Sequence, residues 1–280
     1  MQPEFKLVDV FGTDPFTGNP LAVIADAEHL DTESMQRITR WLNLSETAFL
    51  LPPTTPEADY RVRIFTLTHE LPFAGHPTLG TCHAWLEAGG RPKRDGLIVQ
   101  ECGAGLVAVR QDGDRLAFAA PPLIRGGAPS DAEIAEVAAV LRIDPAAIVE
   151  ARWVDNGPGW IAVLLGSAEA VLAVEPVAKH DRRADIGLVG PHRVGSAAAF
   201  ELRALFTGPG GGMIEDPVTG SLNASVGQWL FESGRVTAPY VAAQGTRLGR
   251  TGRVQVSRDA DGQVWVGGRT LTLVAGRTSA

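Results

Sequence analysis

The stretch ELPFAGHPTLGTCHAWLEAGG, residues 70–90, predicts a helix and shows where it begins and ends. Leu79, Cys82 and Leu86 recur at helical spacing and form one apolar face. Gly89 follows the last turn, where glycine readily adopts the left-handed conformation that ends a helix. The unusual part is the beginning, where glycine, histidine and proline follow one another.

The start of this helix has the features of an anion site. The first backbone N–H groups of a helix have no partner inside it, and the helix dipole adds partial positive charge there. Pro77 is compatible with a first turn, and Gly75 lets a ligand approach the backbone closely. The segment fits either a helix start shaped to receive a carboxylate or an ordinary capped helix, and the residues alone favour the second.

A second helix, predicted in SLNASVGQWLFESG (221–234), begins in a similar way. Leu222, Val226 and Trp229 share one face of it. It is preceded or opened by Asp216, Thr219, Gly220 and Ser221. An Asx-turn followed by a serine N-cap is the common explanation of such a cluster. Two such helix starts facing a cleft would instead suit a small substrate that carries a carboxylate.

Composition limits the possible functions. The chain has 280 residues, of which 45% are apolar, and a formal net charge of -7, which argues against a broad nucleic-acid surface. Apolar runs such as WIAVLL (160–165) are too short to span a bilayer, and MQPEFKLVDVF contains no secretory signal pattern. Two cysteines do not make a disulfide framework. We therefore expect a cytoplasmic protein with reduced thiols and no membrane or nucleic-acid partner.

The chain reads as two halves with a similar order of elements. Prolines and glycines between 121 and 129 mark the best boundary, and each half has strands, a loop and a helix that starts at a Gly/Pro/Thr cluster. GHPTLG (75–80) and DPVTGS (216–221) occupy comparable places, which indicates a weak internal duplication. The expected domains are 1–120 and 130–280. Within the second half, 208–221 is expected to be a loop, whereas VGSAAAFELRALF (194–206) fits neither helical nor strand periodicity.

Glu46 is the most interesting carboxylate. In NLSETAFLL (43–51) it lies at the end of a helical segment and directly before an apolar strand. A half-buried carboxylate in such a place would have a raised pKa and could act as both acid and base. A solvated loop glutamate is the alternative, and it is the commoner case. Glu70 and Glu215, beside the two Gly/Pro clusters, allow the same two interpretations.

Metal and nucleophile chemistry have weaker support. His69, His76 and His83 are spaced by seven, but no histidine or cysteine spacing matches a common zinc pattern, so no metal is expected. Cys102 in ECGAGL could be a nucleophile, although a small buried residue in a strand and turn is the favoured interpretation.

Several motifs taken together resemble one protein family. In chain order they are VDVFGTDPFTGNPLAVI (8–24), NLSETAFL (43–50), RIFTLTHELPFAGHPTLG (63–80), ECGAGLVAV (101–109), EDPVTGS (215–221) and VGG (266–268). From about residue 5 to about residue 270 the chain resembles the phenazine-biosynthesis PhzF-like family, in that family's order. Such collinearity is far more specific than any single motif.

The resemblance implies an α+β fold like that of diaminopimelate epimerase. It implies two pseudo-symmetric domains, each with a sheet wrapped around a central helix, the helices beginning at Pro77 and near Ser221. The last strand could pack back onto the first domain. The resemblance further implies an active site in the cleft between the domains, no cofactor and no metal, and a homodimer.

The resemblance also assigns roles to individual residues. Glu46 matches the family's catalytic acid/base, and His76 and Asp216 match polar residues that shape the site and assist proton movement. The substrate-binding helix starts correspond to Gly75, Pro77, Thr78, Gly220 and Ser221.

The expected function is a cofactor-independent isomerase similar to trans-2,3-dihydro-3-hydroxyanthranilate isomerase, acting on a small carboxylate-bearing substrate. The alternatives are an amino-acid-type epimerase and a non-catalytic binding protein on the same fold. Related epimerases use one cysteine at each helix start, whereas Gly75 and Asp216 stand at those places here. The sequence therefore disfavours a two-thiol racemase.

Overall fold

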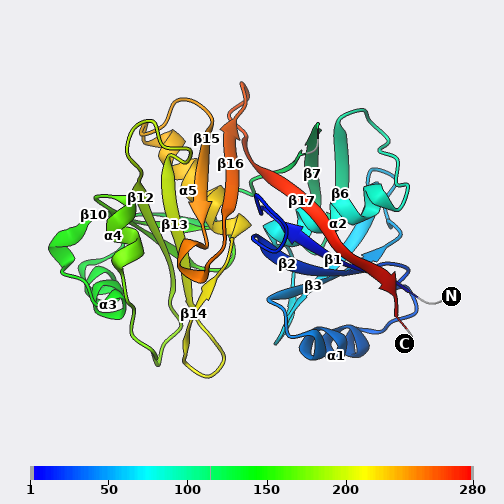
Figure 1. Ribbon diagram of the computed structural model, residues 1–280, viewed down its shortest axis with the longest axis horizontal. Coiled ribbons are helices and arrows are strands. Elements are labelled where there is room, and N and C mark those ends of the chain that lie inside the picture. The colour runs from blue at the N-terminus through cyan, green and yellow to red at the C-terminus, as the bar shows by residue number, and fades with distance from the viewer. Residues whose placement is uncertain (1–2, 114, 279–280) are drawn as a thin grey trace. The chain divides into compact units, whose positions relative to one another are not determined.

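The computed structural model describes residues 3–113 and 115–278, and its chain forms two compact units (Figure 1). The first unit is Met1–Ala119 together with Gly267–Ala280, and the second is Ala120–Val266. The sequence analysis divides the chain into 1–120 and 130–280. The structure ends the first unit at Ala119 and assigns to it most of the last strand, from Gly267 onward.

The first unit contains strands around one central helix. Its elements are β1 (Glu4–Val10), β2 (Asn19–Ile24), α1 (Thr32–Leu42), β3 (Glu46–Leu51), β4 (Tyr60–Thr66), β5 (Glu70–Leu71), α2 (Gly75–Glu87), β6 (Leu97–Cys102), β7 (Gly105–Asp112), β8 (Arg115–Ala119) and most of β17 (Val264–Arg277). β1 pairs antiparallel with β2 and β17, β2 pairs parallel with β3, and β3 pairs antiparallel with β4. β4 then pairs parallel with β6, which continues antiparallel into β7 and β8.

Helix α2 is the central helix of this unit. It packs against β1, β2, β3, β4, β6 and β8, and its residues Gly75–Cys82 are all buried. A helix that is buried all round needs small residues where a strand crosses it closely. Gly80 is such a residue, since a Cβ atom there would lie 2.5 Å from a methyl carbon of Leu21. The helix ends before Gly89, which has φ +91° as expected.

The second unit repeats this arrangement. Its elements are β9 (Arg125–Gly127), α3 (Asp131–Leu141), η1 (Pro145–Ala147), β10 (Ile148–Asp155), β11 (Trp160–Leu165), α4 (Ala168–Ala173), β12 (Asp185–Pro191), β13 (Phe200–Thr207), β14 (Met213–Asp216), α5 (Gly220–Glu232), β15 (Tyr240–Gln244), η2 (Thr246–Leu248) and β16 (Gly252–Arg258). β10 pairs antiparallel with β11, β11 parallel with β12, and β12 antiparallel with β13. β13 pairs antiparallel with β14 and parallel with β15, which pairs antiparallel with β16.

The order of parallel and antiparallel pairs is therefore the same from β1 to β7 as from β10 to β16. The two central helices, α2 and α5, both have 13 residues. Ile64 faces Leu71 four residues before α2 begins, and Ala204 faces Asp216 four residues before α5 begins. By this correspondence LPFAGH (71–76) matches DPVTGS (216–221), which refines the comparison made from the sequence.

The structure corrects three local expectations. The region 208–221 is not all loop, because Met213–Asp216 forms β14 against β13. The ambiguous segment contains a strand, β13, whose period was hidden by the buried charged residues Glu201 and Arg203. Helix α2 begins at Gly75, two residues before Pro77.

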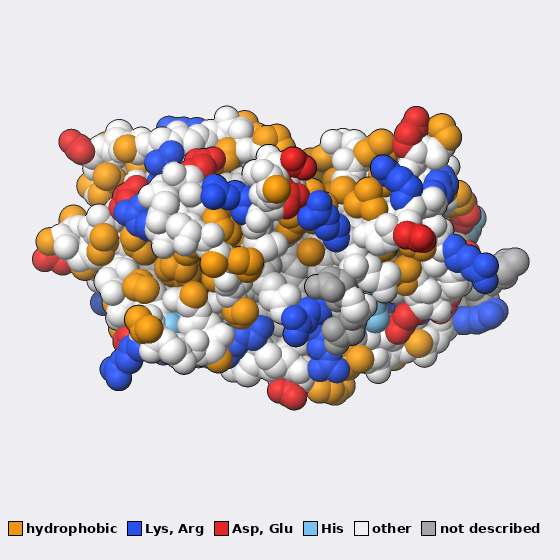
Figure 2. Space-filling model, turned by 90° about the horizontal axis from the view of Figure 1, so that it is seen from above, with side chains coloured by type: hydrophobic (Ala, Val, Ile, Leu, Met, Phe, Trp, Pro, Cys, Tyr) orange, Lys and Arg blue, Asp and Glu red, His pale blue; other side chains and the backbone are white. Residues whose placement is uncertain are grey.

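On the face drawn in Figure 2, basic and acidic side chains are scattered among apolar and neutral ones. Within residues 3–113 and 115–278, no helix combines the length and hydropathy needed to cross a bilayer.

Candidate active site

Glu46 occupies the first position of β3, where the chain leaves the turn that follows α1. Its Cα faces Thr66 of β4 in the antiparallel ladder. The Glu46 side chain is only 18% exposed. The solvated loop position that the sequence allowed is therefore wrong, since the carboxylate lies at the partly buried end of a core strand.

His76 is the partner that the structure brings to Glu46. It is the second residue of α2, and its Nδ1 lies 3.7 Å from Glu46 Oε2 and 3.5 Å from Asn19 Nδ2. Burial lowers the pKa of His76 to about 3, although the backbone of Pro20 acts in the opposite direction. The imidazole is therefore neutral at pH 7, and its contact with Glu46 is not an ion pair.

The β1–β2 loop places Asn19 beside this pair. The Asp9 carboxylate accepts hydrogen bonds from the backbone N–H groups of Thr17 (3.0 Å) and Gly18 (2.8 Å). Gly18 has no room for a side chain, because a Cβ atom would lie 2.2 Å from the carbonyl oxygen of Val10. The GTDPFTGNP motif is thus a closed loop built on Asp9, and it delivers Asn19, fully buried, to the start of β2.

The start of α2 differs from the starts of α1, α3 and α4. Those three helices are capped by the side chains of Asp31, Ser130 and Ser167. Among the described residues, no side chain caps α2, whose N-cap is Ala74, and the first turn contains no acidic residue. An uncapped start keeps backbone N–H groups and the positive end of the helix dipole available to an anion.

Thr78, in contrast, is bonded to the protein. Its hydroxyl donates to the carbonyl oxygen of Ala74 (2.9 Å) and accepts from Gln100 Nε2 (2.9 Å). Gln100 Oε1 in turn accepts from the Tyr60 hydroxyl (3.1 Å), and all three side chains are buried. These hydrogen bonds tie the first turn of α2 to the buried side chains of Gln100 in β6 and Tyr60 in β4.

In the second unit, Asp216 ends β14 and stands four residues before α5. Its Oδ2 accepts a hydrogen bond of 2.5 Å from the hydroxyl of Thr219, the N-cap residue of α5. As at α2, no side-chain cap is found for α5 in the described part of the chain, and its first turn lacks an acidic residue. Within the described residues, both central helices therefore begin without a side-chain cap, unlike the peripheral helices α1, α3 and α4.

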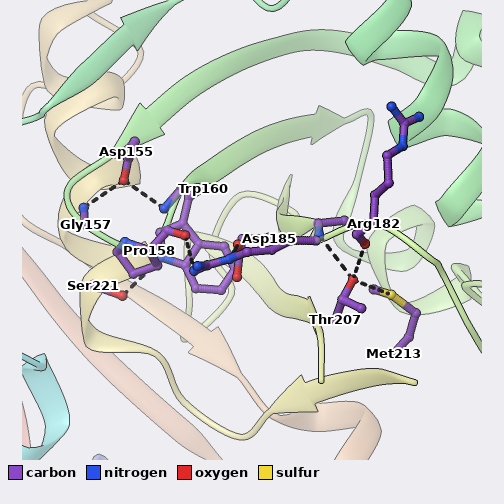
Figure 3. A network of polar contacts seen from close by, with 12 residues as sticks. Asp155, Gly157, Pro158, Trp160, Arg182, Asp185, Thr207, Met213 and Ser221 are labelled. Carbon is purple, nitrogen blue, oxygen red and sulfur yellow. Dashed lines mark hydrogen bonds and ion pairs between the residues drawn. The ribbon is translucent and has the colours of Figure 1, made fainter. Parts of the chain in front are cut away.

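Ser221, the second residue of α5, is held by two residues from the β10–β11 region. Trp160 Nε1 donates to Ser221 Oγ (3.1 Å), and Asn156 Nδ2 donates to the Ser221 carbonyl oxygen (2.9 Å). Figure 3 shows Trp160 and Ser221 pointing toward one another. The loop before Trp160 is fixed by Asp155, which accepts from the N–H groups of Gly157 and Gly159. Because the indole occupies a lone pair of Ser221 Oγ, the hydroxyl proton can be donated elsewhere.

The structure thus groups the predicted site residues within each unit. Glu46, His76, Gly75, Pro77 and Thr78 gather at the start of α2, and Asp216, Gly220 and Ser221 gather at the start of α5. Sequence reasoning missed the buried polar residues behind them, namely Asn19, Gln100, Trp160, Thr219 as a partner of Asp216, and Gln244. No periodic pattern marks such residues; only the paired strands bring them to the helix starts.

The cysteines are unsuited to proton transfer. Cys82 is fully buried inside α2, and burial raises its pKa to about 12. Burial also raises the pKa of Cys102, which lies at the end of β6. Both thiols are protonated at neutral pH, in agreement with the argument against a two-thiol racemase.

Two further observations concern ligands. Across the described residues, no three His, Cys, Asp or Glu side chains form a cluster that could hold a metal ion. A cavity of about 370 Å³ lies between α3 and the β11–β12 pair, lined by residues that include Val137, Trp153 and Asp185. None of the described residues that line this cavity is a predicted site residue.

The family model for phenazine biosynthesis-like proteins matches residues 8–276. The chain belongs to this family. It is 35% identical to "Antisense-enhancing sequence 1" of Schizosaccharomyces pombe over 98% of each chain, and 32% identical to the trans-2,3-dihydro-3-hydroxyanthranilate isomerase of Pseudomonas aeruginosa, also over 98% of each. A solved structure from P. aeruginosa, described as a predicted epimerase, superposes with a TM-score of 0.81 at 28% identity over 100% of both chains. The diaminopimelate epimerase-like fold expected from the sequence is confirmed, and the protein is an isomerase of this family.

Proposed function

We propose that this protein moves a proton between two carbons of a small carboxylate-bearing substrate, with Glu46 as the acid and base. The proposed substrate class is that of trans-2,3-dihydro-3-hydroxyanthranilate, because a relative of 32% identity carries the name trans-2,3-dihydro-3-hydroxyanthranilate isomerase. The observation that carries the proposal is the placement of Glu46 Oε2 beside the neutral, buried His76 at the uncapped start of α2.

The reaction needs no electron acceptor, because it is redox-neutral. Glu46 takes a proton from an sp³ carbon, the C–H electron pair enters the conjugated system, and the double bond shifts. The protonated Glu46 then returns the proton to the carbon at the other end of that system. One carboxyl group therefore serves as base and then as acid, so the pair of proton transfers returns the enzyme to its starting state.

His76 and the helix starts have supporting roles. A neutral imidazole carries one N–H donor and one acceptor, so His76 orients Glu46 and the substrate without adding positive charge. A charged imidazole at this distance would hold the carboxylate as an anion and compete with the carbon acid for it. The N–H groups at the start of α2 are suited to bind an anionic group of the substrate and to stabilise negative charge that develops during the transfer. The start of α5, with the Ser221 hydroxyl, offers the same chemistry within the second unit. Asp216 is proposed to orient the substrate.

The test is proton NMR in deuterated water. Trans-2,3-dihydro-3-hydroxyanthranilate and a panel of conjugated and α-amino carboxylic acids are incubated with the protein. The proposal predicts that a double bond migrates in at least one conjugated acid. Solvent deuterium enters at the carbon that is protonated whenever the carboxyl proton of Glu46 exchanges with solvent between the two transfers.

The rival functions give different spectra. Deuterium at a single α-carbon, with inversion and without bond migration, would identify an epimerase. Ligand-induced shifts in the protein without any exchange would identify a binding protein. Either result contradicts the proposed carbon-to-carbon transfer.

A further inference from the structure

Gln244 makes four hydrogen bonds around the start of α5. It ends β15 and is fully buried. Its Oε1 accepts from the Thr219 N–H (3.1 Å) and from Asn223 Nδ2 (2.8 Å). Its Nε2 donates to the Asp216 carbonyl oxygen (3.3 Å) and to Thr219 Oγ1 (2.9 Å).

The backbone partners fix the direction of these hydrogen bonds. A backbone N–H can only donate and a backbone carbonyl can only accept, so the amide orientation of Gln244 is determined by Thr219 and Asp216. Thr219 Oγ1 therefore faces an N–H donor and accepts from it. Its own proton is left to donate to Asp216 Oδ2, 2.5 Å away. The result is a series of two hydrogen bonds, in which Gln244 donates to the Thr219 hydroxyl and that hydroxyl donates to the Asp216 carboxylate; we call this series the Gln244–Thr219–Asp216 relay.

The first unit shows that the fold does not require the hydrogen bond between the Thr219 hydroxyl and the Asp216 carboxylate. In both units a buried strand glutamine contacts the fourth residue of the central helix: Gln100 Nε2 donates to Thr78 Oγ1, whereas Gln244 Oε1 accepts from Asn223 Nδ2. At the positions that match Asp216 and Thr219, however, the first unit has Leu71 and Ala74. The glutamine is thus common to both helix starts, whereas the Thr–Asp pair is added in the second unit alone.

We propose that Gln244 and Thr219 are positioning residues that hold the Asp216 carboxylate in a fixed orientation at the start of α5. The inference deepens the proposed function, because it gives Asp216 a fixed direction from which to orient the substrate. The hydroxyl of Thr219 is the essential part, and its methyl group is not. Removing only that hydroxyl should release the carboxylate and leave the fold intact, because Ala74 suffices at the equivalent place.

Thr219→Val and Thr219→Ser separate the two parts of the side chain. Valine keeps the shape and removes the hydroxyl; serine keeps the hydroxyl and removes the methyl group. Both variants are labelled with [4-¹³C]aspartate, and the Asp216 signal is identified by its loss in Asp216→Asn. Titrating this signal measures the Asp216 pKa directly. The other charged groups near this strand end, Glu215 paired with Arg203 and Arg250 beside the Gly245 turn, are unchanged in both variants.

The relay predicts that Thr219→Val raises the measured Asp216 pKa by about one unit, since a carboxylate that loses a donated hydrogen bond is protonated more easily. Thr219→Ser should reproduce the wild-type titration. Thr78→Val is the matched control, because it breaks the Gln100–Thr78 contact, whose hydroxyl ends on a backbone carbonyl, and should leave the Asp216 signal unchanged. An unchanged Asp216 titration in Thr219→Val, or an equal shift in Thr219→Ser, overturns the proposal.

Turnover of a substrate found by the deuterium experiment provides the second readout. Thr219→Val should lower kcat roughly tenfold and Thr219→Ser by less than about twofold, as expected for a lost hydrogen bond to a charged group. Equal kcat values for the wild type and Thr219→Val would contradict the link to catalysis. If the wild type turns over nothing in the panel, the proposed function fails while the titration still decides whether the relay exists.

Discussion

His76 shows how a single buried side chain can set the character of the site. Its side chain is 4% exposed, and burial lowers its pKa to about 3, so its ring stays neutral beside the Glu46 carboxylate. Its Nε2 has no hydrogen-bond partner among the described residues. Burying an ionisable ring that must stay neutral costs free energy, and groups with pKa values shifted in this way cluster at functional sites.

The two cysteines give a prediction at the same scale. Because burial raises the pKa of both thiols, we expect iodoacetamide at pH 7.5 to leave Cys82 unmodified in the folded protein and to cause no loss of turnover. Unfolding in urea should make both cysteines react. Mass spectrometry of peptides after timed alkylation measures this. Loss of activity in parallel with modification of Cys82 would support a thiol mechanism and contradict the one proposed here.

At the scale of an element, a residue of strand β11 orients a side chain at the start of α5. Trp160, the first residue of β11, donates its indole N–H to Ser221 Oγ and so directs the serine proton outward. Trp160→Phe keeps the ring and removes this donor. We expect KM for a carboxylate substrate to rise about fivefold, in line with roughly 1 kcal/mol for one hydrogen bond, with kcat little changed.

Trp153→Phe is the matched control for that variant. Its indole also donates to a side chain, Glu133, but in the peripheral helix α3. Steady-state kinetics of both variants should show a raised KM only for Trp160→Phe. Equal effects of the two substitutions would mean that Trp160 acts through general packing and would contradict its role at the helix start.

The elements also show which parts of the fold could be predicted. Helices α1 and α3 begin at caps that can be read from the sequence, Asp31 and the Ser130–Glu133 capping box, because a cap is a local signal within four residues. Strand β14 was missed because its residues follow a glycine-rich turn and are ordered only by pairing with β13. Strand β13 was ambiguous because Arg203 is buried there, bonded to Glu215 and to two backbone carbonyls. Such partners lie far away in the sequence, so periodicity cannot indicate them.

The residues of the candidate site also fall into those that the sequence predicts and those that only the structure reveals. Glu46, His76 and Asp216 were found through motifs that resemble a family, and the structure brings Glu46 and His76 within 3.7 Å. Gln244 and Trp160 carry no motif, and their importance comes only from what they contact. Buried polar residues of this kind need a three-dimensional structure to be recognised.

For the whole molecule, His76 should make stability depend on pH. In the unfolded chain its pKa is near 6.5, and in the folded protein it is about 3, so between these values the unfolded state binds a proton that the folded state does not. Stability is therefore lost as the pH falls below about 6.5. From pH 6.5 to pH 5.0 this one residue should cost about 1.5 kcal/mol.

Urea unfolding of the wild type and His76→Gln at both pH values isolates this contribution. Glutamine does not titrate, so the variant should lose about 1.5 kcal/mol less than the wild type over the same interval. His83, whose pKa is also lowered by burial, is present in both proteins and cancels. Identical losses in the two proteins would show that His76 is not held neutral in the folded state.

The duplicated fold gives the two units similar helix starts and different chemistry. Each unit has an uncapped central helix supported by a buried glutamine. The first adds Glu46 and His76, and the second adds Asp216, Thr219 and Ser221. The uncapped helix starts common to both units are the features proposed to bind an anion, and the differing side chains are those proposed to transfer the proton and to orient the substrate.

The most direct test of the central claim compares Glu46→Gln with Glu70→Gln in deuterated water. Both replace a carboxylate by an amide of the same shape, but Glu70 lies outside the site and pairs with Arg63 at 2.6 Å. With a substrate that the wild type isomerises, Glu46→Gln should lower kcat by about a thousandfold or more and abolish deuterium incorporation, whereas Glu70→Gln should stay within about twofold of the wild type. Isomerisation by Glu46→Gln at a rate close to that of Glu70→Gln would contradict the assignment of Glu46 as the acid and base.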